Sequence, residues 1–172
     1  MSRPNYILLP ANPFFIGLSL VLAFLLNLLP WGSLIAVPDF VAITLVFWSI
    51  HQPRKVGIGV AFLMGVLMDV HDSVYFGENA LAFTLLSYFA ISIHRRVLWF
   101  PPSVQSFQVF PLFLGVQLVQ LAVRLLISSN SHFPGWWYFL ECIVNTALWP
   151  LATWLLLAPQ RRSVDKDDTR PI

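Results

Sequence analysis

The stretch that decides the fold is residues 107–128, FQVFPLFLGVQLVQLAVRLLIS, in which Arg124 is the one charged residue. An apolar segment of about 20 residues is long enough to cross the hydrocarbon core of a bilayer as a helix. Over the whole chain of 172 residues, 58% are hydrophobic and 10% are charged, whereas a soluble domain carries about 25% charged residues. The sequence therefore predicts an integral membrane protein.

Further apolar segments, separated by polar residues or by proline and glycine, flank this stretch on both sides. The first does not resemble a cleaved signal peptide, because it is long and ends without a small-x-small cleavage pattern. We predict one all-α domain, residues 1–159, built as a bundle of six transmembrane helices, and a polar tail, residues 160–172, that is expected to be disordered. The six predicted spans are residues 14–29, 39–50, 56–70, 80–93, 107–128 and 136–157.

Basic residues alternate between the loops. Nine of the ten lie at the N-terminus, in the second and fourth loops and in the C-terminal tail, and the first, third and fifth loops have none. This distribution follows the positive-inside rule and predicts a multi-pass protein with six spans and both termini in the cytoplasm. The second and third spans are short, so a re-entrant hairpin is the alternative. It would leave Arg54 and Lys55 in the membrane or on the wrong side, and we favour full crossing.

Small residues form a stripe along the third span. Gly57, Ala61, Gly65 and Asp69 are each four residues apart and so share one helix face. Small residues at this spacing allow close helix packing. We predict a packing or partner-binding seam with Asp69 as a polar anchor near the outer membrane face; the alternative is that Asp69 merely marks the interface.

Asp39 follows Pro38 at the start of the second span, where an acidic side chain complements the helix dipole. A polar pocket shared with Asp69 is the other interpretation. In both, the two acids lie near the outer face.

Polar residues inside the last two spans require partners, because an isolated charge in lipid is costly. Arg124 and Glu141 lie at depths of about 6 and 7.5 Å below the outer surface at 1.5 Å per residue, and we predict an ion pair between them. The same depth estimate places Gln120 level with Asn145, and we predict that they form a second polar pair. The alternative for Arg124 is that it reaches the outer headgroups alone.

Catalytic and metal-binding motifs are absent from the sequence. The segment Asp69-Val70-His71-Asp72-Ser73 has no second set of ligands at metal-site spacing, and no nucleophile–base pair is visible. No basic run suggests nucleic-acid binding, and the single cysteine, Cys142, excludes an intrachain disulfide. We expect no enzyme activity, no cofactor and no metal.

Several short motifs lie along most of the chain. The central ones are Val37-Pro38-Asp39-Phe40, Trp48, Gln52-Pro53-Arg54, Gly57-Ile58-Gly59, Phe62, Gly65, Asp69 and Gly77. This set resembles the signature region of the MreD family of rod shape-determining membrane proteins, which implies a multi-pass protein of a bacterial inner membrane. Leu29-Pro30-Trp31 also fits the end of the family's first span, and Val144-Asn145-Thr146-Ala147-Leu148-Trp149-Pro150 is similar to its last-helix motif.

This resemblance implies a non-enzymatic scaffold of the cell-elongation (rod) complex that helps to direct side-wall peptidoglycan synthesis and to maintain rod shape. Its expected partners are MreC first, then MreB, RodA and penicillin-binding protein 2 directly or through MreC, besides membrane lipid. In helix count and size the family also looks like the substrate-binding subunits of energy-coupling-factor vitamin transporters. A small-molecule-binding transporter subunit is therefore the alternative function, although a shared fold does not imply a shared function.

Overall fold

The computed structural model describes residues 6–8, 12–31, 37–72, 75–127 and 135–163 of the chain. Each of the six predicted apolar segments contains a helix, so the prediction of an all-α bundle with six helices is confirmed for the described residues. The helices are α1 (Pro13–Asn27), α2 (Phe40–His51), α3 (Ile58–Asp72), α4 (Glu78–Val97), α5 (Pro102–Ile127) and α6 (Leu140–Leu157), with 3₁₀ turns η1 (Trp136–Phe139) and η2 (Ala158–Gln160) on either side of α6.

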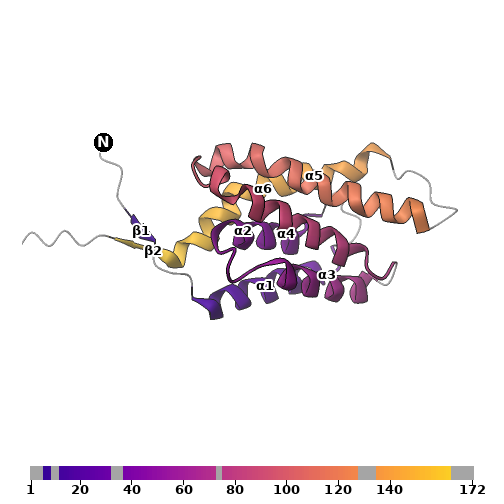
Figure 1. The fold of residues 1–172 in the computed structure, drawn as a ribbon, viewed down its shortest axis with the longest axis horizontal. Coiled ribbons are helices and arrows are strands. Elements are labelled where there is room, and N and C mark those ends of the chain that lie inside the picture. The colour runs from indigo at the N-terminus through magenta and orange to yellow at the C-terminus, as the bar shows by residue number, and fades with distance from the viewer. Residues whose placement is uncertain (1–5, 9–11, 32–36, 73–74, 128–134, 164–172) are drawn as a thin grey trace, which may run out of the picture.

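The helices lie side by side along the long axis of the molecule and alternate in direction (Figure 1). Asp39 before α2 contacts Asn27 at the end of α1, and Arg124 near the end of α5 contacts Glu78 at the start of α4. We call this end of the bundle the acidic end, because it holds Asp39, Asp69, Glu78 and Glu141. The opposite end, called the basic end, holds Arg54, Lys55, Arg95 and Arg96.

Helix α2 is the central helix of the bundle. Its residues 41–50 are all buried, and it packs on α1, α4 and α6. A helix that is apolar on every side is expected inside a bundle, which explains why the sequence shows no polar face here.

The twelve residues of α2 span only about 18 Å, which is short for a full membrane crossing and is the reason for considering a re-entrant hairpin. In a hairpin, α2 and α3 would pack mainly on each other, whereas α3 packs mainly on α4.

The outside of the bundle is apolar as well. Large side chains such as Leu63, Phe107 and Leu126 are 63%, 82% and 85% exposed, which suits contact with lipid rather than water. Within the described residues, Pro102–Ile127 and Trp136–Gln160 are long and apolar enough to cross a membrane, and three shorter helices are also apolar. The structure thus fits a membrane protein, while the crossing of all six helices stays a prediction.

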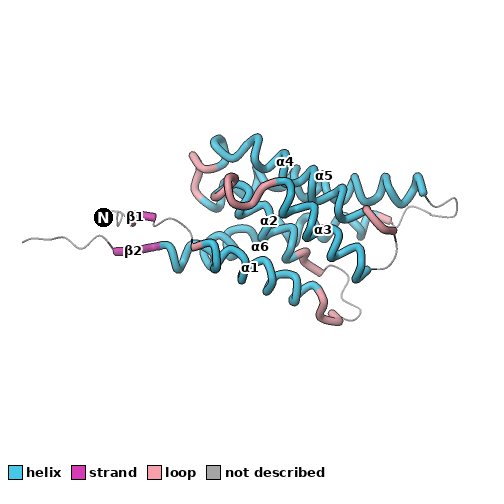
Figure 2. The backbone as a smooth tube through the Cα atoms, turned by 60° about the horizontal axis from the view of Figure 1, so that its bottom comes forward, coloured by secondary structure: helices cyan, strands magenta, loops and turns pink. Residues whose placement is uncertain are grey.

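A short antiparallel ribbon joins the two ends of the described chain. Strand β1 (Tyr6–Leu8) pairs with β2 (Arg161–Ser163), with Tyr6 opposite Ser163. Figure 2 shows the pair outside the bundle, next to the start of α1 and the end of α6. This pairing was not predicted, since residues 161–163 fall in the tail that we expected to be disordered. Residues 164–172 of that tail lie outside the described residues.

Candidate functional site: the acidic end and an apolar groove

Gly65 in α3 lies directly against the start of α4. A Cβ atom on Gly65 would lie 2.5 Å from Ala80 Cα and 2.6 Å from the Asn79 carbonyl oxygen, well inside contact distance. Ala61, one turn earlier, is fully buried, while a Cβ atom on Gly57 would meet only ordinary contacts. The small-residue stripe therefore packs within the bundle, and its tight point is Gly65.

Asp69 caps helix α4 from the neighbouring helix α3. Its Oδ2 accepts hydrogen bonds from the backbone N–H groups of Gly77 (2.9 Å) and Ala80 (3.1 Å), and its Oδ1 accepts one from Asn79 (2.7 Å). The first N–H groups of a helix have no partner within the helix, and Gly77 at the N-cap has no side chain to supply one. Asp69 takes that role, and it is only 3% exposed. It anchors α4 to α3 rather than lying open at the interface.

Asp39 connects three helices. Its carboxylate Oδ1 caps α2 by accepting from Ala42 N (2.9 Å) and also accepts from Asn27 Nδ2 (2.8 Å). Its backbone N–H donates to Asn145 Oδ1 of α6 (2.9 Å), and Asn27 Oδ1 accepts from Phe40 N (3.0 Å). The first-turn role expected for Asp39 is therefore that of an N-cap, tied to the ends of α1 and α6.

The predicted pairing of Arg124 with Glu141 is wrong. Arg124 Nε lies 2.6 Å from Glu78 Oε1, whereas no hydrogen bond or ion pair between Arg124 and Glu141 is found among the described residues. The depth estimate compared α5 only with α6, but α5 also packs along α4. The start of α4 brings Glu78 to the same depth.

The predicted pairing of Gln120 with Asn145 is also wrong. Gln120 Nε2 donates to Asn79 Oδ1 (2.8 Å), while Asn145 bonds the backbone of Asp39. The reason is again the neighbouring helix α4, whose first turn carries Asn79. Tyr138 adds an aromatic face, with the Arg124 guanidinium 5.8 Å from its ring centroid.

These side chains surround a small polar cavity of about 250 Å³ at the acidic end. Of the predicted residues, Asp39, Gln120, Arg124 and Glu141 line it, Asn145 accepts a hydrogen bond from the backbone N–H of Asp39 in its wall, and Asp69 lies apart from it. Sequence reasoning missed three contributors: Asn27, Glu78 and Asn79. Each is a polar residue at the end of an apolar segment, where the sequence pattern is equally compatible with a loop. In the described part of the chain, no group of three or more histidine, cysteine, aspartate or glutamate residues is placed to hold a metal ion.

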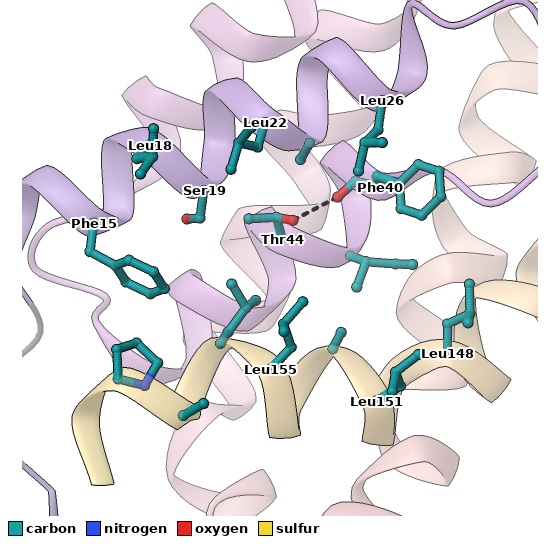
Figure 3. Close-up of a pocket in the computed structure, with 16 residues that line it drawn as sticks. Phe15, Leu18, Ser19, Leu22, Leu26, Phe40, Thr44, Leu148, Leu151 and Leu155 are labelled. Atoms are coloured by element: carbon teal, nitrogen blue, oxygen red, sulfur yellow. Dashed lines mark hydrogen bonds between the residues drawn. The ribbon is translucent and has the colours of Figure 1, made fainter. Parts of the chain in front are cut away.

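A larger apolar groove runs along the side of the bundle. Its volume is about 670 Å³, with α1 and α6 as walls and α2 as floor (Figure 3). The polar groups in the groove already have hydrogen-bond partners within the protein. Thr44 Oγ1 donates to Phe40 O (2.8 Å), and Ser19 Oγ accepts from Trp48 Nε1 (2.8 Å). The walls are mainly leucine, namely Leu18, Leu22, Leu26, Leu148, Leu151 and Leu155.

Comparison with known proteins identifies the family. The family model of the rod shape-determining protein MreD matches residues 10–158. The rod shape-determining protein MreD of Haemophilus influenzae is 29% identical over 150 residues, which cover 84% of this chain and 88% of that protein. No solved structure gives a significant match. The family has a role in rod shape determination and is a structural rather than an enzyme family. The chain belongs to the MreD family of rod shape-determining proteins.

Proposed function

We propose that this protein is a non-enzymatic scaffold of the cell-elongation complex, held in the bacterial inner membrane by six helices with both termini in the cytoplasm. In this role it helps to direct side-wall peptidoglycan synthesis. The family match supports the role in cell shape. The segregation of charge supports the orientation, because the basic end carries Arg54, Lys55, Arg95 and Arg96, and cytoplasmic loops are rich in such residues.

The polar cavity supports a scaffold rather than a transporter subunit. A transporter subunit requires an open pocket whose polar groups bind a ligand, and such pockets usually measure about 300–1,000 Å³. Here the cavity is about 250 Å³, and its polar side chains bond one another across helices, as Asn27 does with Asp39 and Gln120 with Asn79. Groups already paired in this way fix helix positions.

The apolar groove between α1 and α6 is the observation that carries the proposal. Leu18, Leu22 and Leu26 on α1 are 44%, 51% and 39% exposed, so this wall is open along about two helical turns. An apolar helix can pack in such a groove through van der Waals contact alone. We assign the groove to a membrane-embedded segment of MreC, the partner that the family resemblance implies. MreB, RodA and penicillin-binding protein 2 join directly or through MreC.

The test is a pair of matched tryptophan substitutions on α1. Leu22 and Leu25 are both 51% exposed, but only Leu22 lines the groove. In cells depleted of the native protein, Leu22→Trp should fill the groove, abolish co-purification of MreC and give rounded cells at normal protein level. Leu25→Trp should retain MreC and rod shape. If both variants retain MreC, the groove holds only lipid acyl chains, and the docking proposal is wrong.

A further inference from the structure

The basic end of the bundle carries a hollow that the proposed scaffold role does not use. It lies at the end of α4, has a volume of about 440 Å³ and is lined by Arg95, Arg96, Trp99 and Phe100. Two guanidinium groups thus stand beside two aromatic rings. Trp99 is 89% exposed and Phe100 is 42% exposed, so the hollow opens to the outside of the bundle.

The two arginines have no ion-pair partner among the described residues. The acidic residues of the described chain lie at the other end, where Asp69 caps α4 and Glu78 binds Arg124. An unpaired guanidinium pair therefore faces this hollow. Because guanidinium groups bind phosphate oxygens in a bidentate manner, the natural complement is a phosphate group.

The backbone around the hollow is fixed by internal contacts. Val97 between the arginines and the rings is buried. Phe100 N donates to Val97 O (3.2 Å), and Gln105 Nε2 donates to Phe100 O (2.9 Å). Trp149 Nε1 in turn donates to Gln105 Oε1 (3.3 Å). These hydrogen bonds join the turn after α4 to α5 and α6. The backbone that carries the two arginines and the two rings is therefore held in place.

We infer that this hollow binds the headgroup of an anionic phospholipid of the cytoplasmic leaflet. The phosphodiester lies between Arg95 and Arg96, and the glycerol and upper acyl carbons lie against Trp99 and Phe100. Aromatic side chains prefer this depth of the membrane, and basic hollows on the cytoplasmic side of membrane helices recruit anionic lipids. The inference rests on the proposed orientation, because it places the basic end at the inner leaflet.

The test measures lipid binding by the purified full-length protein. Protein in detergent is mixed with equal amounts of phosphatidylglycerol and phosphatidylcholine of the same chain length, and bound lipid is counted by native mass spectrometry. The wild-type protein should prefer phosphatidylglycerol. Arg95→Gln with Arg96→Gln should weaken that preference about tenfold or more. The matched control is Arg54→Gln with Lys55→Gln, which removes two charges from the same end, outside the hollow.

The control should keep the wild-type preference. An equal loss in both double variants would assign the effect to diffuse surface charge and overturn the site, as would a wild-type protein with no preference. Displacement of the lipid by millimolar inorganic phosphate would assign the hollow to a free anion instead. Failure here is distinguishable from failure of the scaffold role, which is scored by MreC recovery and cell shape in cells. All four substituted side chains are exposed, and circular dichroism checks that each variant is folded.

Discussion

Gly65 of α3 and Ala80 of α4 approach so closely that a Cβ atom on Gly65 would lie 2.5 Å from Ala80 Cα. Four residues after Gly65, Asp69 accepts the N–H groups of the same turn of α4. The missing side chain and the carboxylate therefore act together. The first lets α3 approach the start of α4, and the second satisfies the polar groups exposed there.

Gly65→Ala should destabilise the protein, although the added group is one methyl. The methyl would meet backbone atoms, which cannot rotate away as a side chain can, so a cost of about 1–3 kcal/mol is expected. The measurement is thermal unfolding of the purified protein in detergent, together with protein level in membranes. Gly65→Leu should be worse still.

The matched control for Gly65 is Gly59→Ala on the same helix. A Cβ atom on Gly59 has nothing within 4 Å, and alanine favours a helix over glycine by about 0.5–1 kcal/mol. Gly59→Ala should therefore leave stability unchanged or raise it slightly. Equal melting temperatures for Gly65→Ala and the wild type would mean that α3 and α4 separate easily, contrary to this structure.

Asp69 should tolerate asparagine better than leucine. Asparagine keeps one oxygen, which can accept the two bonds now made by Oδ2, from Gly77 and Ala80. Leucine leaves all three N–H groups without their acceptor, and each buried orphan donor costs about 1–3 kcal/mol. In a shape-complementation assay with protein level measured, Asp69→Asn should retain much of the function and Asp69→Leu little. Complete loss with asparagine at normal protein level would point to a chemical role for the carboxylate.

The helices could be predicted from sequence because they depend on local patterns. The six apolar segments and the alternating charges identify all six helices, and the spacing of Gly65 and Asp69 places them on one face. The partners of these residues depend on which helices are neighbours. Depth along the chain placed Arg124 level with Glu141, but it could not reveal that α4 contributes Glu78 at the same level. Counting depths in two successive helices also could not predict contacts between helices distant in sequence, such as the contact of Asp39 with Asn145.

Arg124 and Glu78 should show coupling in a double-mutant cycle. Arg124→Ala leaves the carboxylate of Glu78, only 3% exposed, without this cation, whereas Glu78→Ala leaves a cation that is 40% exposed and can reach water or headgroups. Arg124→Ala should thus be the more damaging single change, with a coupling energy of about 1–3 kcal/mol from thermal unfolding. The same cycle with Glu141→Ala in place of Glu78→Ala should be closer to additive. Strong coupling to Glu141 alone would contradict the observed pair.

The orientation can be tested by reporter fusions along the chain. Fusions after Gln52, Pro102 and Gln160 should score cytoplasmic, because these positions belong to the basic end. Fusions near Ser33, Ser73 and Asn130, which lie outside the described residues, should score external. A cytoplasmic signal at Ser73 would mean that α2 and α3 do not both cross, and would revive the re-entrant hairpin.

Asn27 should be intolerant of aspartate, although the two side chains have nearly the same shape. Asn27 Nδ2 donates to Asp39 Oδ1, while Asn27 Oδ1 accepts from Phe40 N. Asn27→Asp keeps the acceptor but turns the donor into an oxygen that faces the Asp39 carboxylate. The lost bond and the repulsion between two partly buried carboxylates should lower stability by about 1–3 kcal/mol. The reciprocal double variant, Asn27→Asp with Asp39→Asn, removes one of the two facing carboxylates, although the amide group at the Oδ1 position can either donate to the new carboxylate at position 27 or accept from Ala42 N, not both. It should therefore recover part of the lost melting temperature. Additive losses in the double variant would show that the two side chains act separately, and that the junction of α1 with α2 is held by other contacts.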